Sequence, residues 1–365
     1  MGAFKDELGA DAIDRIASAF HAVDPAFPHA AFVQSALDGL QDLELKARVE
    51  HLARGLHDQL NARFGCTPEA NWQQRLELMQ AALDQGLRGF VAWPIIDSVA
   101  WFGRERPQES VPALARMTSA FSAEFAIRPF LLDDRKSTLR TMLRWAESED
   151  EHVRRLASEG SRPVLPWGIA LPELKQDPQL TRPILEALRL DEADYVRRSV
   201  ANHMNDHSKL HADYVLDTIG AWGGLDLPWA KHALRTLIKQ GHPGVWPLLG
   251  FDPQTPVTIQ LDAAPDAVAM GDELRFSFTL RNPGASGQGV MLDYQVHFVR
   301  ARGPRSVKVF KLRELRLKPG EERTIEKRHS FRPVTTRRDY PGEHRIVLQL
   351  NGRETVSFDF ALTEA

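Results

Sequence analysis

The chain has 365 residues, of which 43% are hydrophobic and 26% charged, and its formal net charge at pH 7 is −3. This composition is ordinary for a folded globular protein and excludes collagen, coiled coil or disorder as its overall class. No stretch approaches the roughly 18 uncharged apolar residues of a membrane span, and the first thirty residues are too charged for a secretion signal. The single cysteine, Cys66, excludes an intrachain disulfide. We therefore expect a cytoplasmic protein with no membrane association and an inert Cys66 thiol.

The part of the chain before about residue 255 is predicted to be helical. Apolar residues recur there at helical spacing, as in the run Leu76, Met79, Leu83 and Leu87. The sequence Glu-His-Val-Arg-Arg around Val153 is echoed by Asp-Tyr-Val-Arg-Arg around Val196, 43 residues later. A period of about 40 to 47 residues is typical of HEAT and armadillo repeats. Residues 1–255 are therefore predicted to form an α-helical HEAT-like repeat solenoid.

Stacked repeats place equivalent residues in columns. Short echoes of the repeat run from Ser122 to Pro129 and from Ala157 to Pro163. We therefore expect Glu124, Glu159 and residues 202–206 to lie close together despite their separation in sequence.

From about residue 256 the apolar period changes from helical to two. Leu274, Phe276, Phe278 and Leu280 alternate with polar residues, and three later segments repeat the alternation. Turn signals separate these segments: Asn282-Pro-Gly, Lys318-Pro-Gly, Tyr340-Pro-Gly and Asn351-Gly352. About seven short strands are typical of an antiparallel immunoglobulin-like β-sandwich. Residues 256–365 are predicted to form such a domain.

Residues 300–338 of this second domain are strongly basic, with 14 Lys and Arg against 4 Glu. An excess of this size favours a polyanionic partner, and nucleic acid is the first candidate. The alternative is a solvated sheet edge, because lysine and arginine also protect edge strands from aggregation.

Two segments of the helical part carry the candidate chemistry, residues 154–168 and 199–209. Arg155 and Arg198 recur at the repeat spacing and are candidates for contacts with successive phosphates, although one of each arginine pair could instead form an ion pair between repeats. Glu159 is expected near a helix end, because Gly160 is a good terminator. Trp167 lies in a Pro-Trp-Gly loop, where it can cover the core or offer a flat face to a sugar or base.

A row of histidines offers a rival interpretation. His203, His207 and His211 are four residues apart, which would place three imidazoles on one helical face beside Asp206. The sequence has no His-Glu-x-x-His motif, and such rows more often pack against neighbouring side chains. We expect no metal and no cofactor.

The chain resembles the AlkC DNA glycosylases, HEAT-like alkylation-repair proteins related to AlkD. The resemblance runs end to end and is most specific in Ala157-Ser-Glu-Gly-Ser-Arg-Pro, Pro166-Trp-Gly and Ser199-Val-Ala-Asn-His-Met-Asn-Asp. Some members carry an immunoglobulin-like extension, which residues 256–365 are similar to. The resemblance implies Glu124, Glu159, Trp167 and Asp206 as the active-site residues. It also implies excision of cationic alkylated bases from DNA, 3-methyladenine first and 3-methylcytosine as a further candidate.

This chemistry suits the residues. A base methylated at N3 is positively charged and already a good leaving group, so carboxylates need only stabilise the oxocarbenium-like sugar and position water. We expect a monomer acting on double-stranded DNA, with Arg155, Arg162, Arg198 and Lys209 as candidate DNA-binding residues and residues 256–365 as an accessory DNA-contacting domain. The alternatives are a non-catalytic repeat scaffold that binds nucleic acid or protein, and a metal-dependent hydrolase using the histidine row.

Overall fold

The computed structural model describes residues 4–65, 68–333 and 338–364. Cys66, and Arg337 of the basic segment, lie outside the described residues. The chain divides into two compact units, Met1–Leu210 and His211–Ala365. Within the described residues, none of the helices is both long and apolar enough to cross a bilayer.

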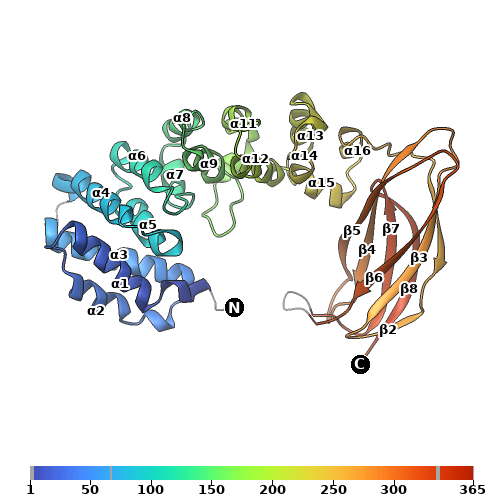
Figure 1. Cartoon of the computed structure of the whole chain (residues 1–365), viewed down its shortest axis with the longest axis horizontal. Helices are drawn as coiled ribbons and strands as arrows, with labels where there is room; N and C mark the ends of the chain where they lie inside the picture. The colour runs from blue at the N-terminus through green and yellow to red at the C-terminus, as the bar shows by residue number, and fades with distance from the viewer. Residues whose placement is uncertain (1–3, 66–67, 334–337, 365) are drawn as a thin grey trace. The chain divides into compact units, whose positions relative to one another are not determined.

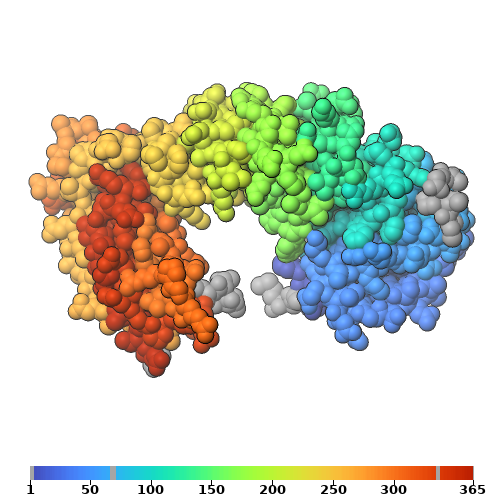
Figure 2. Space-filling model, turned by 180° about the vertical axis from the view of Figure 1, so that it is seen from behind, coloured from blue at the N-terminus to red at the C-terminus, as the bar shows by residue number. Residues whose placement is uncertain are grey.

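The first unit is a succession of paired helices, which follow one another in chain order from α1 to α12 (Figures 1 and 2). Its α-helices are α1 Ala10–Val23, α2 His29–Leu37, α3 Leu45–Phe64, α4 Pro68–Asp84, α5 Trp93–Phe102, α6 Pro107–Met117, α7 Arg128–Asp133, α8 Arg135–Trp145, α9 Glu151–Gly160, α10 Pro172–Gln176, α11 Arg182–Leu188 and α12 Asp194–His207. A 3₁₀ turn, η1 Phe4–Leu8, precedes α1, and others lie between helices, among them η3 Gly89–Ala92 and η4 Pro178–Leu180. The HEAT-like helical prediction is confirmed for this unit.

Helices α9 and α12 begin with the two similar sequences around Val153 and Val196. Helix α9 is capped at its first turn by the Asp150 carboxylate, which accepts a hydrogen bond from the His152 amide. Val153 and Val196 occupy equivalent places in the two helices, and both are buried. The repeat therefore corresponds to a real packing unit, in which one apolar stripe per helix faces its neighbours.

The second unit begins with four short helices and continues as a β-sandwich. The helices are α13 Ala212–Ala221, α14 Ala230–Ala233, α15 Arg235–Gln240 and α16 Val245–Leu248. The strands are β1 Thr258–Ala263, β2 Ala267–Ala269, β3 Glu273–Arg281, β4 Gln288–Phe298, β5 Ser306–Leu317, β6 Glu322–Ser330, β7 Gly342–Leu350 and β8 Arg353–Thr363. One sheet has the order β1-β3-β6 and the other β2-β8-β7-β4-β5, with only the short β2–β8 pair parallel.

The sandwich core consists of the residues that alternation predicted. Leu274, Phe276, Phe278 and Leu280 of β3 are buried and face side chains from β4, β7 and β8. Their register against β6 is regular, with Phe278 opposite Ile325. One face of each strand thus fills the space between the sheets, as the period of two requires.

The tight turn between β7 and β8 packs against the helical part of the same unit. Asn351 and Gly352 connect β7 to β8 with positive φ angles of 48° and 75°, which is the turn that Asn-Gly favours. The Asn351 side chain donates to the Asp252 carbonyl at 2.8 Å and accepts from the Met291 amide at 2.8 Å. A Cβ on Gly352 would lie 2.4 Å from the Trp246 ring. Helix α16 therefore packs directly against this turn.

Candidate active site

The carboxyl-terminal halves of α9 and α12 lie side by side. The Ser199 hydroxyl donates to the Ser158 hydroxyl at 2.9 Å, and His203 Nδ1 donates to the Ser158 carbonyl at 3.0 Å. Burial lowers the pKa of His203 well below its ordinary value, so the imidazole is neutral at pH 7. These contacts hold the segments carrying Glu159 and Asp206 against each other.

Three carboxylates and two arginines form one connected cluster. Arg155 Nη1 lies 2.9 Å from Glu124 Oε2, and Arg155 Nη2 lies 3.6 Å from Glu159 Oε1. Arg162 Nη1 donates to Glu159 Oε1 at 2.6 Å. Arg162 Nε and Nη2 donate to the two oxygens of Asp206 at 2.8 and 3.0 Å. The spatial grouping predicted from the repeat columns is confirmed.

The cluster is largely withdrawn from water, and the buried Arg128, which interacts electrostatically with all three carboxylates, adds a third guanidinium group beside it. Burial would lower the pKa of Arg162, but its hydrogen bonds to Asp206 and the charge of Glu159 raise that pKa above the ordinary value. Arg155 and Arg162 therefore stay charged and partly neutralise the carboxylates, which is what makes their burial tolerable. Glu159 Oε2 is buried and makes no hydrogen bond to the described residues, so one carboxylate oxygen keeps its capacity to accept.

Gly160 ends α9 for a reason that differs from the expected one. It has no positive φ and is the last residue of the helix rather than a left-handed cap. A Cβ at this position would lie 2.6 Å from Ile127 Cγ2. Glycine is required because the end of α9 packs closely on the segment that precedes α7, and this packing brings Glu159 toward Glu124.

Trp167 lies in a loop whose carbonyls are held by two basic side chains from distant parts of the unit. The buried Arg128 donates to the carbonyls of Gly160, Arg162 and Ile169 at 3.0, 2.8 and 2.7 Å. Lys46 Nζ donates to the Trp167 carbonyl at 2.8 Å. Burial, with the charge of Arg162, lowers the pKa of Arg128 to about 10, which leaves it protonated at pH 7.

The Trp167 backbone is left-handed, with a φ of 64°, although its side chain is 54% exposed. A bulky residue in this region is strained by about 1–2 kcal/mol, and such strain persists only where surrounding contacts impose it. Here those contacts are the hydrogen bonds from Lys46 and Arg128. Packing alone therefore does not explain why the loop exposes the Trp167 indole to solvent.

The predicted DNA-binding residues fall into two groups. Arg198 is exposed and forms an ion pair with Asp194 at 2.7 Å, and Lys209 is exposed after the end of α12. Arg155 and Arg162 are instead mostly buried, in the ion pairs described above, and the Arg155 guanidinium lies 4.6 Å over the Tyr195 ring. Phosphate contact by any of the four stays a prediction.

The histidine row does not form as the spacing suggested. Helix α12 ends at His207, and His211 is the residue before α13, so the three imidazoles do not share one helical face. His203 and His207 are buried beside each other, with ring centroids 5.5 Å apart. Among the described residues, no three His, Cys, Asp or Glu side chains are placed to hold a metal ion.

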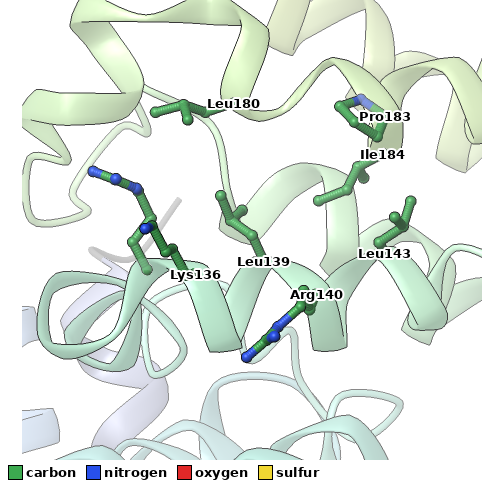
Figure 3. Close-up of a pocket in the computed structure, with 8 residues that line it drawn as sticks. Lys136, Leu139, Arg140, Leu143, Leu180, Pro183 and Ile184 are labelled. Carbon is green, nitrogen blue, oxygen red and sulfur yellow. The ribbon is translucent and has the colours of Figure 1, made fainter.

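Three concave regions are described on the first unit. The first, of about 550 Å³, borders Trp167 and extends between α3 and α5. The second, of about 400 Å³, lies between α8 and α11, where Leu139, Leu143 and Ile184 line an apolar surface beside Lys136 and Arg140 (Figure 3). The third, of about 330 Å³, is lined by residues of α6, α7 and α8. Only the first shares a residue with the candidate site.

Comparison with known proteins places this geometry in a family. A family model described as the C-terminal Ig-like domain of uncharacterised protein YhaZ matches residues 258–364. The uncharacterized protein YhaZ of Bacillus subtilis (strain 168) is 35% identical over 364 residues, covering 98% of this chain and 97% of YhaZ. The solved structure of Pseudomonas fluorescens alkylpurine DNA glycosylase AlkC, bound to DNA containing an abasic site analog, matches with a TM-score of 0.91 and 38% identity over 99% of both chains.

The chain belongs to the AlkC family. Its HEAT-like helical part followed by an immunoglobulin-like domain is thus the AlkC architecture. Two residues outside the sequence-based set also shape this site, Arg128 and Lys46, and Asp97 lines the cavity that Trp167 borders. A signal existed for Arg128, because Arg128-Pro129 echoes Arg162-Pro163 in the repeat.

Proposed function

We propose that this protein is a monofunctional DNA glycosylase that excises positively charged alkylated bases, chiefly 3-methyladenine and also 3-methylcytosine, from double-stranded DNA. One observation carries the proposal: three carboxylates converge around two arginines, in a segment that Arg128 ties to the loop of an exposed, strained tryptophan. The end-to-end likeness to an alkylpurine DNA glycosylase supports it. A non-catalytic repeat scaffold has no need to bury three carboxylates in one cluster, because buried charged groups are costly to desolvate.

The proposed reaction breaks the bond between C1′ of the deoxyribose and the ring nitrogen of the base. The bonding electron pair leaves with the base and cancels its positive charge, so no acid is needed. The sugar becomes an oxocarbenium-like cation, which the carboxylates of the cluster stabilise. Water then adds its oxygen to C1′ and gives a proton to a carboxylate acting as general base.

The roles of Glu159, Asp206 and Trp167 are proposed from their exposure and their contacts. Glu159 Oε2, which has unused acceptor capacity, is suited to orient the water. Asp206, held by both nitrogens of a bidentate arginine contact, is suited to face the developing sugar charge. The exposed Trp167 indole can add cation–π attraction to the same charge.

The immunoglobulin-like domain is proposed to supply phosphate contacts. Strand β5 is the edge of the five-stranded sheet. Phe310, Leu312 and Leu315 pack against the core, which leaves the exposed Lys311, Arg313 and Arg316 facing away from it. A row of cations on an open sheet edge can follow a DNA backbone.

The deciding experiment is the release of free 3-methyladenine from methylated DNA by the purified protein, measured chromatographically. We expect release that leaves abasic sites, at a rate unchanged by EDTA, because a leaving group that is already cationic gains little from a Lewis acid. DNA binding without release would favour the scaffold. Loss of activity in EDTA, restored by zinc, would favour the histidines as metal ligands.

A further inference from the structure

The cavity beside Trp167 has the composition of a site for a flat aromatic ligand. At about 550 Å³ it falls within the size range of small-molecule sites. Four aromatic side chains line it, Trp93, Trp101, Phe125 and Trp167. Trp93 and Phe125 stack on each other with ring centroids 5.1 Å apart, so this wall is rigid.

The cavity and the proposed reaction site have one residue in common. Both include Trp167, and the cavity residues Phe125 and Ala126 follow Glu124 in the chain. Lys46, which also lines the cavity, holds the Trp167 carbonyl. A base released beside the Trp167 indole therefore lies at the border of this cavity.

Asp97 gives the aromatic cavity a polar group. It interrupts the otherwise largely apolar helix α5 and lines the cavity. The other charged side chains that line it are Lys46 and Glu50 from α3 and Arg104, which follows α5, and Arg104 is engaged by Asp133 at 2.7 Å. Burial raises the pKa of Asp97 to about 7, with opposing effects from Trp93 and Lys46. Near neutral pH this carboxyl group is therefore partly protonated.

We propose that this cavity binds the excised purine base after the glycosidic bond is broken, an inference that rests on the proposed function. A protonated carboxyl group donates one hydrogen bond and accepts another. The 6-amino group and the adjacent ring nitrogen of an adenine offer the complementary pair, as they do to asparagine or glutamine amides. The aromatic wall supplies the stacking surface for the ring.

Binding of free 3-methyladenine to the full-length protein, without DNA, tests the proposal by calorimetry or equilibrium dialysis. We expect a dissociation constant of about 0.1–1 mM, in keeping with a ligand of few atoms. Asp97→Ala and Trp101→Ala should each weaken binding about tenfold or more. Leu143→Ala, in the separate α8–α11 cavity, is the matched control and should leave it unchanged.

The Asp97→Asn variant distinguishes a specific hydrogen-bonded contact with the base from general packing in the cavity. An amide pairs with the base at every pH, whereas the wild-type carboxylate loses its donor when it ionises. We expect Asp97→Asn to bind equally at pH 6 and pH 8 and the wild type to bind more weakly at pH 8. Equal affinity of wild type and Asp97→Ala at pH 6 would overturn the proposal.

Two further comparisons distinguish the inference from the function on which it rests. Free 3-methyladenine should slow excision by the wild type but not by Asp97→Ala. Deoxyadenosine monophosphate should not slow excision if the cavity binds a released base rather than a base that is still attached to a sugar. Excision with no binding of free base would overturn this inference alone. No excision of any alkylated base would overturn the proposed function and, with it, the assignment of a product to this cavity.

Discussion

At the residue scale, the site consists of three carboxylates that guanidinium groups hold in place. Arg155 and Arg162 each bridge two of the three carboxylates, which fixes the carboxylate positions before any substrate binds. In the proposed reaction such fixed charges need little reorganisation when the sugar becomes cationic, and this preorganisation is the source of the electrostatic stabilisation that we propose. The arginines serve the same end whether or not they also contact phosphate.

Asp206→Asn tests this arrangement. Removing the charge should lower single-turnover excision about 10²- to 10³-fold, while DNA affinity holds or rises because a negative group has left the proposed DNA-binding face. The amide still accepts one hydrogen bond from Arg162, so we expect the protein to fold with a lower melting temperature. Asp194→Asn, on the exposed start of the same helix, is the control and should excise normally. Near-normal excision by folded Asp206→Asn would remove Asp206 from the mechanism.

Asp97 should make stability depend on pH. Its folded pKa of about 7 lies above the unfolded value, so the folded state binds more protons between about pH 4 and pH 7 and stability falls as pH rises through this window. Asp97→Asn removes the dependence. We expect the variant to gain on the order of 2 kcal/mol over the wild type at pH 8, partly reduced by solvent in the cavity, and almost nothing at pH 4. Denaturant unfolding at the two pH values measures the difference, and an equal gain at both would contradict it.

At the scale of elements, the end of α9 is positioned by packing on the segment before α7. Gly160→Ala adds a methyl group where only 2.6 Å separates it from Ile127 Cγ2. Overpacking of this kind typically costs about 1–3 kcal/mol, even though alanine is the better helix former. We expect lower thermal stability and at least about tenfold slower excision, because Glu159 shifts with the helix end.

The double variant with Ile127→Ala distinguishes a steric effect from a conformational one. Deleting the Ile127 branch makes room for the new methyl group, so the two changes should compensate and excision should partly recover. If the double variant is as slow as Gly160→Ala alone, the glycine is needed for a reason other than this close approach.

The sequence repeat was sufficient to predict which carboxylates meet, because Glu124 and Glu159 stand at echoing positions and stacked repeats align such positions. The hydrogen bonds that shape the Trp167 loop could not be predicted from the repeat. Arg128 and Lys46 act on backbone carbonyls, which are the same at every residue, so the echo that marks Arg128 does not identify the groups it holds, and nothing in the repeat marks Lys46. The end of α12 at His207 could not be predicted either, because no glycine or proline follows it closely in the sequence.

At the scale of the whole molecule, charge is divided between the two compact units. Residues 1–210 hold 25 Lys and Arg against 31 Asp and Glu, and residues 211–365 hold 21 against 18. The change of period near residue 255 marks where the strands begin, at Thr258. The compact units divide earlier, after Leu210, because α14 and α16 pack on the sandwich through Lys231–Glu314 and Trp246–Gly352.

This division matters for testing the accessory domain. A chain cut near Thr255 would leave Trp246 without the β7–β8 turn that covers it, so loss of activity could follow from misfolding alone. Surface substitutions in the intact protein avoid the difficulty. Lys311, Arg313 and Arg316 are exposed on the edge strand β5, and changing them to glutamine removes positive charge without disturbing the core.

If these three side chains bind phosphates, the triple variant should bind DNA more weakly, and the slope of log affinity against log salt should fall by about 0.9 for each phosphate that is no longer neutralised. Excision under saturating DNA should change little, because the carboxylate cluster is untouched, whereas excision at low DNA concentration should fall. The control replaces Arg275 and Arg281, which are exposed on the other sheet and paired with Glu273 and Glu322, and it should retain the wild-type slope. An unchanged slope in the triple variant would mean that the β5 edge is a solvated surface, as lysine and arginine on an unpaired strand can also be.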